Sequence, residues 1–186
     1  MDLIESNNVI LSNERLLLRE FNENDWIDVH KYASQDKVSQ YQPWGPNTEK
    51  DTKDFIHKAM NAAAEEPRLR YVLAIVHKDD NRMIGAGEFN IRDFTNKSGE
   101  IGYIVNPEYW GKGIATSVAK LLIDFGFREL NLHRIYATCD TRNIGSLMVL
   151  ERAGMTREGK IREDLLIKDG WRSSLLYSVL EYEWNK

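Results

Sequence analysis

Two glycines one residue apart, Gly111 and Gly113, stand where a predicted strand gives way to a predicted helix. The strand covers residues 100–105, and the helix follows from the spacing of apolar residues between 112 and 128. Glycine permits a positive φ and a close approach of the backbone to a ligand. The free N–H groups at the start of the helix, helped by the charge of Lys112, could then hold a pyrophosphate. A tight strand–helix turn that binds nothing explains the same glycines equally well, so both interpretations stay open.

The surrounding sequence excludes the commoner phosphate-binding loops. It contains no G-x-x-x-x-G-K-[ST] pattern and no G-x-G-x-x-G followed about 20 residues later by an acidic residue. The predicted elements also fail to alternate in the order of a doubly wound fold. The absence of these patterns excludes a P-loop nucleoside triphosphatase and a dinucleotide-binding domain.

Hydrophobic periodicity predicts a chain of the α+β class. We expect strands at residues 15–20, 71–76, 83–91, 100–105, 134–138, 165–167 and 175–182. We expect helices from Asn22 or Asn24 to about Ser34 and at residues 48–65, 112–128 and 143–152. Local signals support their ends: Thr48 with Asp51 forms a capping box, Gly154 is a left-handed C-cap, and Asp169-Gly170 is a hairpin turn. The order implies a three-strand meander, a crossover helix and a final hairpin.

Composition narrows the class of protein further. No repeat or flexible linker divides the sequence, so we expect one domain over residues 1–186. A net charge of −4 argues against a nucleic-acid partner, and a single cysteine, Cys139, allows neither an internal disulfide nor a thiolate metal cluster. No apolar run reaches the length of a membrane span, so we expect no membrane partner. The polar N-terminus is unlike a signal peptide, and we therefore expect a cytoplasmic protein.

Four segments, in the right order, carry a resemblance to a known family. They are residues 13–19 followed by Asp25, residues 100–105, residues 110–115, and Asn143-x-x-Ser146 running on to Met155. Together they make the chain similar to the GNAT superfamily of acyl-CoA transferases, and within it to the RimJ/RimL-type ribosomal-protein N-terminal acetyltransferases. Trp110 stands where the superfamily loop commonly has Arg or Gln, a form typical of this group. The resemblance implies a mixed, mostly antiparallel sheet of about seven strands flanked by helices, with the fourth and fifth strands splayed apart.

The resemblance also implies the cosubstrate, acetyl-CoA, and the residues that bind it. The loop implied to hold the pyrophosphate is Trp110, Gly111, Lys112, Gly113, Ile114, Ala115 and Thr116. The backbone of Tyr103, Ile104 and Val105 is implied to bind the pantetheine arm, with a local bulge that aims an N–H at the thioester carbonyl. Asn143 is implied to contact the pantetheine amides, although asparagine is also among the best helix N-caps. The two roles do not exclude each other.

Two residues are candidates for catalysis. Ser146 lies three residues after Asn143 and so shares its helix face, where some relatives place a serine that hydrogen-bonds the departing sulfur. Glu100, at the start of the splayed strand, is the carboxylate best placed to act as a base. The alternatives are a polar first-turn residue and a solvated carboxylate at a strand edge. An α-amine has a pKa of about 7.7–8.0 and needs only a weak base or a water relay, whereas a lysine at about 10.4 needs an activated one.

The acceptor amine is less constrained. Trp44, in a loop with Pro43 and Pro46, is the expected acceptor wall, with a core or lid aromatic as the alternative. The expected reaction is direct attack of the amine on acetyl-CoA in a ternary complex, because no Cys-His or Ser-His pair is evident. Cys139 is expected to be a buried hydrophobe, and the four histidines show no metal-ligand spacing. The expected acceptor is a protein or peptide N-terminus. A polyamine, an antibiotic amine, a non-catalytic acyl-CoA sensor and a homodimer stay open.

Overall fold

A single sheet organises the computed structural model, which describes residues 8–184. Its eight strands are arranged in the order β1-β2-β3-β4-β5-β6-β8-β7, and each neighbouring pair is antiparallel except β5 with β6, which is parallel. The strands are β1 (Ile10–Ser12), β2 (Leu16–Glu20), β3 (Arg70–His77), β4 (Arg82–Asp93), β5 (Ser98–Val105), β6 (Arg134–Asp140), β7 (Thr156–Ile167) and β8 (Gly170–Leu180). The mixed, mostly antiparallel α+β fold expected from the sequence is confirmed, with one more strand than expected.

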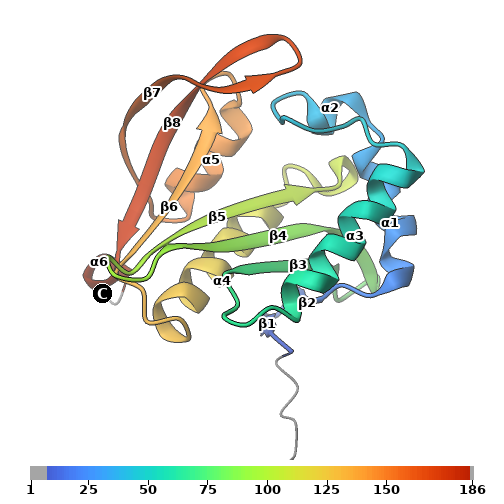
Figure 1. Ribbon diagram of the computed structural model, residues 1–186, viewed down its shortest axis with the longest axis horizontal. Coiled ribbons are helices and arrows are strands. Elements are labelled where there is room, and N and C mark those ends of the chain that lie inside the picture. Colours follow the sequence, from blue (N-terminus) through green and yellow to red (C-terminus); the bar gives the residue numbers. More distant parts are fainter. Residues whose placement is uncertain (1–7, 185–186) are drawn as a thin grey trace, which may run out of the picture.

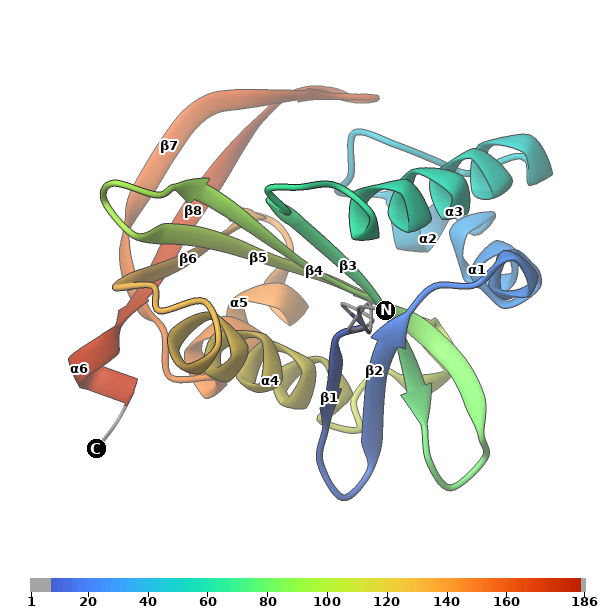
Figure 2. The same cartoon turned by 60° about the horizontal axis from the view of Figure 1, so that its bottom comes forward.

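The helices cover both faces of the sheet. They are α1 (Trp26–Ala33), α2 (Asp36–Ser39), α3 (Glu49–Ala63), α4 (Ile114–Arg128), α5 (Ile144–Arg152) and α6 (Glu181–Trp184). Figure 2 shows α1, α2 and α3 on one side of the sheet and α4 and α5 on the other. None of the helices in the described part of the chain has the length and hydropathy required to cross a bilayer.

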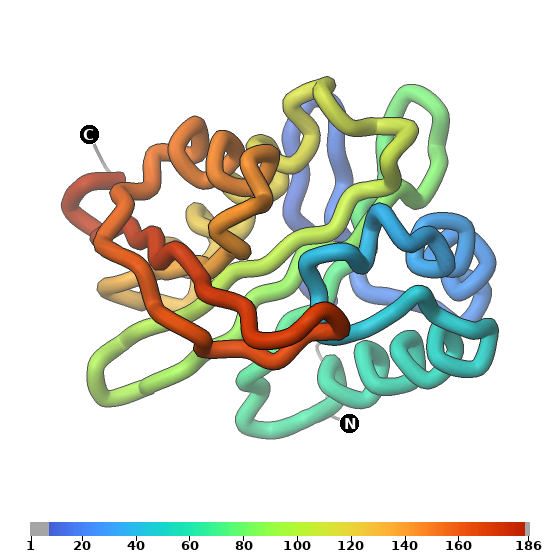
Figure 3. The backbone as a smooth tube through the Cα atoms, turned by 90° about the horizontal axis from the view of Figure 1, so that it is seen from above, coloured from blue at the N-terminus to red at the C-terminus, as the bar shows by residue number. Residues whose placement is uncertain are grey.

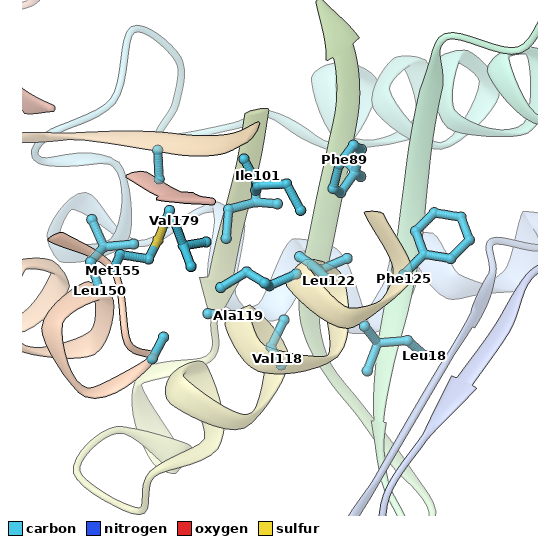
Figure 4. Packing of buried hydrophobic residues seen from close by; sticks show 14 of the residues in the cluster. Leu18, Phe89, Ile101, Val118, Ala119, Leu122, Phe125, Leu150, Met155 and Val179 are labelled. Carbon is cyan, nitrogen blue, oxygen red and sulfur yellow. The ribbon is translucent and has the colours of Figure 1, made fainter. Parts of the chain in front are cut away.

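Apolar side chains at helical spacing dock α4 onto the sheet. Val118, Ala119 and Leu122 are completely buried and pack against residues of β2, β4 and β5 (Figure 4). Burying a leucine side chain contributes about 2–3 kcal/mol, so the interface is a large stabilising term. A second cluster, built around Phe21, Val29 and Ile56, fills the opposite face beneath α1 and α3.

The local signals read from the sequence are present. Thr48 and Asp51 form the capping box of α3, Gly154 has a φ of +92° after α5, and the chain reverses at Gly170 between β7 and β8. A helix cap needs a side-chain oxygen next to the first turn, and a positive φ favours glycine. Both requirements involve only neighbouring residues, so the sequence was sufficient to predict them.

The strands differ from the prediction in several places. β1 was not expected, because its three residues show no alternation and it exists only by pairing with β2. β7 begins at Thr156 rather than at residue 165, because its first half is polar and mostly exposed and so lacks a period-2 pattern. The last strand ends at Leu180, and α6 takes up residues expected to continue it.

The sheet splits between β5 and β6. The two strands pair only at Ser98–Arg134, Gly99–Ile135 and Glu100–Tyr136, and beyond these residues they diverge (Figure 1). The expected splay is therefore confirmed. The bulge expected within residues 103–105 is not found, because β5 pairs with β4 in unbroken register from Gly99 to Val105. The irregularity lies at the other end of β5, between Ile91 and Asp93 of β4.

Candidate active site

The glycine turn between β5 and α4 has the conformation that the sequence predicted. Gly111 and Gly113 have φ values of +74° and +76°, and Gly113 is the N-cap of α4. No side-chain cap closes the helix at this point, so the N–H groups of the first turn face outward at the positive end of the helix dipole. An added Cβ at either glycine would meet nothing within 4 Å. The turn is therefore open, and its backbone is arranged to receive an anion.

A groove of about 630 Å³ starts at this turn and runs between α2, β5 and α5. It is lined by eleven of the twelve residues that the sequence assigned to the cosubstrate: Tyr103, Ile104, Val105, Trp110, Gly111, Gly113, Ile114, Ala115, Thr116, Asn143 and Ser146. Lys112 is the exception, since its Nζ lies 5.0 Å from the centre of the Tyr109 ring rather than in the groove. Lys37, Arg142 and Arg152 provide positive charge there instead. No sequence motif indicated them, because α2 and α5 meet the loop only in the folded chain.

Trp110 has a definite contact at the groove edge. Its indole Nε1 donates a hydrogen bond of 2.7 Å to the carbonyl oxygen of Val105, and about half of its side chain is exposed. The indole therefore braces the turn against the end of β5. One carbonyl of the strand expected to bind pantetheine is consequently already occupied.

Asn143 caps α5. Its Oδ1 accepts a hydrogen bond of 3.1 Å from the backbone N–H of Ser146, so the capping interpretation is confirmed. The side chain also carries an NH₂ donor, which capping does not use. A contact between this donor and the cosubstrate stays a prediction.

Ser146 belongs to a small polar cluster at the split. Its Oγ lies 3.1 Å from the hydroxyl of Tyr103, and the buried thiol of Cys139 lines the same part of the split. Burial raises the pKa of Tyr103 well above its usual value, and burial raises the pKa of the Cys139 thiol to about 11. Both groups therefore stay protonated at neutral pH. The resemblance implied a role for the Tyr103 backbone alone. The partner of the Tyr103 hydroxyl is 43 positions away, so no local pattern predicts this contact.

A second cavity, of about 950 Å³, lies on the α1–α3 face of the split. Trp44 lines it with Pro43 and Pro46, and the ring also packs against the cluster under α1 and α3. Trp44 therefore lines a cavity and packs on the core at the same time, and its role as an acceptor wall stays a prediction. The two cavities share the lining residues Tyr41, Gln42, Tyr103, Ile104, Asn143 and Ser146. They therefore meet where β5 and β6 separate.

Glu100 lines the second cavity, but an arginine holds it. Its Oε2 accepts 2.8 Å and 2.6 Å contacts from Arg92. Glu100 precedes Tyr103 by three residues of extended strand, which is about 10 Å. Glu88 lies on the same face opposite Gly102, and it is held by Arg70 at 2.8 Å and by Asn90 at 3.0 Å. This second carboxylate has no local signature in the sequence, because only the β4–β5 register brings it into the cavity.

Two of the four histidines have local side-chain partners. Within residues 8–184, no three side chains among His, Cys, Asp and Glu gather closely enough to hold a metal ion. His30 contacts Thr52, and His77 contacts Asp80. These contacts give the two histidines local structural partners.

A mostly antiparallel sheet that splits between two parallel strands, with a cavity on each side, defines a site for bringing two substrates together. Residues 15–156 match the family described as "Acetyltransferase (GNAT) domain", and the chain belongs to this family of acetyltransferases. Sequence and structure thus agree on an enzyme that transfers acetyl groups.

Several relatives match nearly the whole chain, and others match part of it. The "uncharacterized N-acetyltransferase YnaD" of Bacillus subtilis is 37% identical over 94% of this chain and 99% of its own length. The spermidine N(1)-acetyltransferase of Escherichia coli is 29% identical over 56% of each chain. A GNAT-family acetyltransferase structure from Bacillus anthracis has a TM-score of 0.82 and 34% identity, covering 94% of this chain and 99% of that one. The ribosomal-protein-S5-alanine acetyltransferase of Vibrio fischeri has a TM-score of 0.80 and 26% identity, covering 95% and 98%. The acceptors in these names differ, so the family alone does not choose one.

Proposed function

We propose that this chain is an N-acetyltransferase that moves the acetyl group of acetyl-CoA to the α-amine of a protein or peptide N-terminus, acting in the cytoplasm. The observation that carries the proposal is the meeting of two cavities at Tyr103, Ile104, Asn143 and Ser146. One cavity begins at a helix N-terminus suited to a pyrophosphate, and the other is large enough for a peptide end. A relative named for ribosomal-protein alanine acetylation has the same fold.

In this proposal the donor occupies the groove of about 630 Å³. The N–H groups at the start of α4 bind the pyrophosphate, and the free edge of β5 together with Asn143 binds the pantetheine arm. The thioester then lies at the split, beside Tyr103 and Ser146. Trp44 forms part of the wall against which the acceptor lies in the second cavity.

The chemistry requires a neutral amine and a stabilised leaving group. Roughly a tenth of an α-amine is neutral at pH 7, so a distant base is sufficient. Glu100 takes the proton through a water relay, because about 10 Å of strand separates it from Tyr103. The amine attacks the thioester carbonyl, the tetrahedral intermediate collapses, and the C–S bond breaks to release the CoA thiolate. Ser146, supported by the Tyr103 hydroxyl, donates a hydrogen bond to that sulfur.

Direct transfer is favoured over an acyl-cysteine intermediate. Cys139 is 4% exposed, and burial raises the pKa of its thiol to about 11, so almost none of the thiolate nucleophile is present at neutral pH. We expect Cys139→Ala to keep at least half of the wild-type kcat. A dead variant that still binds CoA, or an acetylated Cys139 trapped by mass spectrometry, would overturn direct transfer.

The proposed function is tested by measuring CoA thiol release with N-terminal peptides, lysine-containing peptides with blocked N-termini, and spermidine. Turnover of the free N-terminal peptides, with acetylation of the α-amine confirmed by mass spectrometry, is the expected result. Turnover of spermidine alone would transfer the assignment to small-molecule amines. CoA binding without turnover of any acceptor would instead favour an acyl-CoA sensor.

A further inference from the structure

Arg172 of β8 is a buried positive charge on the wall of the acceptor cavity, the cavity of about 950 Å³. Only 8% of the residue is exposed. Its Nε and Nη2 donate to the Ser174 hydroxyl at 3.1 Å and 2.9 Å, and its Nη1 donates to the carbonyl oxygen of Tyr41 at 2.8 Å. Within residues 8–184, no carboxylate oxygen comes within 4.0 Å of this guanidinium.

This arrangement is unusual, because a buried charge is normally paired with an opposite one. Asp140 lies within Coulombic range of Arg172, but its carboxylate oxygens accept hydrogen bonds from Arg142, from Nε at 3.0 Å and from Nη2 at 2.8 Å, and none from Arg172. The contacts of Arg172 use three of its five N–H donors, all on neutral oxygens. The remaining donors belong to a guanidinium that borders the cavity.

The carboxylates that line the same cavity all have hydrogen-bond or ion-pair partners, whereas the hydrogen-bond partners of Arg172 are neutral oxygens. Among the described residues, each carboxylate that lines the cavity has a partner: Glu88 with Arg70, Glu100 with Arg92, Asp140 with Arg142, Asp54 with Lys50, and Asp51 with Thr48 at the α3 cap. A polycation would therefore find every negative group already engaged. An anion would find a partner in Arg172.

Arg172 also lies close to the split. Ser174, two residues along β8, pairs with Asp140, which follows Cys139 on β6. Two residues of strand span about 7 Å, so a group bound to Arg172 lies a few bonds away from an amine at the split. Arg172 also fixes Tyr41, one of the residues shared by both cavities, and Figure 3 shows the β7–β8 hairpin beside this segment.

We propose that Arg172 is a specificity-determining residue that binds a carboxylate carried by the acceptor close to its reacting amine. The proposal rests on the proposed function and narrows its substrate class to carboxylate-bearing amines. The carboxylate has two sources: an acidic side chain near a peptide N-terminus, or the α-carboxylate of a free amino acid or dipeptide. The alternative is that Arg172 only braces Tyr41 against β8.

The test compares matched acceptors by kcat/KM. One arm uses C-terminally amidated peptides that differ only by glutamate or glutamine in the second position. The other arm uses dipeptides with a free or an amidated C-terminus, and spermidine is the polycation. We expect at least a tenfold preference for the carboxylate form in one arm, which identifies its source, and low turnover of spermidine.

Arg172→Gln should raise KM for the carboxylate acceptor by roughly 30-fold and reduce the acid-over-amide preference to near one. Arg172→Lys keeps the positive charge but loses the paired N–H donors of the guanidinium. Its acid-over-amide preference should lie between those of wild type and Arg172→Gln. Arg162→Gln removes an exposed positive charge from the same hairpin and should leave the preference unchanged. Thermal melts with and without CoA show that each variant folds and binds the donor.

Several results would overturn the proposal. They are an equal rate for acid and amide in wild type, a preference that survives in Arg172→Gln, and a preference for spermidine. N-terminal turnover without any acid preference would reject the role of Arg172 and keep the proposed function. If no acceptor is turned over, the proposed function fails. Calorimetric titration of the same acid and amide peptides in the presence of CoA then measures whether Arg172 recognises the carboxylate, independently of turnover. Equal affinities for the two peptides would reject the carboxylate site.

Discussion

The two sides of the split sheet depend on different structural features: backbone conformation on one side and side-chain contacts on the other. On the donor side, the turn at Gly111 and Gly113 relies on backbone conformation and on the start of one helix. On the proposed acceptor side, charged side chains from α3, β3, β4, β5, β6 and β8 line the wall together with apolar ones such as Trp44. The residues of the turn are consecutive in the sequence. The other residues of its groove, on α2 and α5, and the charged residues of the second cavity come together only through packing.

This difference explains why the sequence of the turn indicates the family, whereas the sequence of the second region does not indicate the substrate. A backbone turn requires glycine at fixed positions, so its signature stays local. An ion pair such as Arg70–Glu88 can be built from many residue types at many positions, so it leaves no local signature. Perturbing the two regions separately therefore tests whether donor binding and acceptor choice are independent.

The largest expected effect comes from Gly85 of β4. It lies against the backbone of Ile104, a residue that lines both cavities. A Cβ at this position would sit 2.2 Å from the carbonyl oxygen of Ile104 and 3.1 Å from the Cα of Val105. Because both atoms belong to the backbone, Gly85→Ala should destabilise the protein by about 3 kcal/mol. Urea unfolding measures this loss. Gly102→Ala, whose Cβ meets nothing within 4 Å, is the stability control. Equal stability of Gly85→Ala and wild type would disprove the close approach of β4 and β5.

A smaller effect, confined to the donor side, is expected for Gly113→Ala. Its φ of +76° disfavours any side chain, although the space around it is open. The variant should lose about 1 kcal/mol of stability and bind CoA roughly tenfold more weakly, with the acceptor KM unchanged. Calorimetry and steady-state kinetics measure the two quantities. Gly159→Ala, in a negative-φ strand position with nothing nearby, should change neither. A rise in acceptor KM would show that the two regions are coupled.

The boundary between the regions is tested by Ser146 and Tyr103, whose hydroxyl oxygens are 3.1 Å apart. Ser146→Ala should lower kcat about tenfold, equivalent to about 1.4 kcal/mol, with little change in either KM. If the two hydroxyls act as a unit, adding Tyr103→Phe should lower kcat by less than the product of the single effects. A Ser146→Ala enzyme with wild-type kcat would leave the serine as an ordinary first-turn residue.

The smallest effect concerns the acceptor-side hairpin and appears as a pH dependence. Arg134 and the Ser178 hydroxyl lower the pKa of Glu158 to about 2, from an ordinary value near 4.5. Since the folded-state pKa is the lower one, this stabilisation is present above pH 4.5 and is lost as the pH falls toward 2. Partial exposure of the pair limits it to below about 1 kcal/mol. Thermal melts from pH 6 to pH 3 should show a smaller loss in Glu158→Gln than in wild type, while Glu14→Gln, an exposed control, should follow wild type. A wild-type slope in Glu158→Gln would contradict the assignment.

The elements with strong local signals could be predicted from the sequence. α3 with its Thr48 cap, α4 with its apolar stripe and the turn at Gly170 were all predicted, because caps, periodicity and glycine turns depend on near neighbours. β1 and the first half of β7 were missed, because their stability comes from pairing with another strand. For the same reason, the expected bulge in β5 could only be checked against the β4 register, which is continuous there.

The sequence by itself therefore determined the family and the donor turn, since glycine spacing, caps and hydrophobic period are properties of consecutive residues. Only the tertiary structure decided the pairing of Glu100 with Arg92, the hydroxyl contact of Tyr103, and the burial of Arg172 without a carboxylate. Each of these depends on which strands lie side by side, and therefore on contacts between residues far apart in the chain. The charges around the cavity proposed for the acceptor are arranged by those contacts.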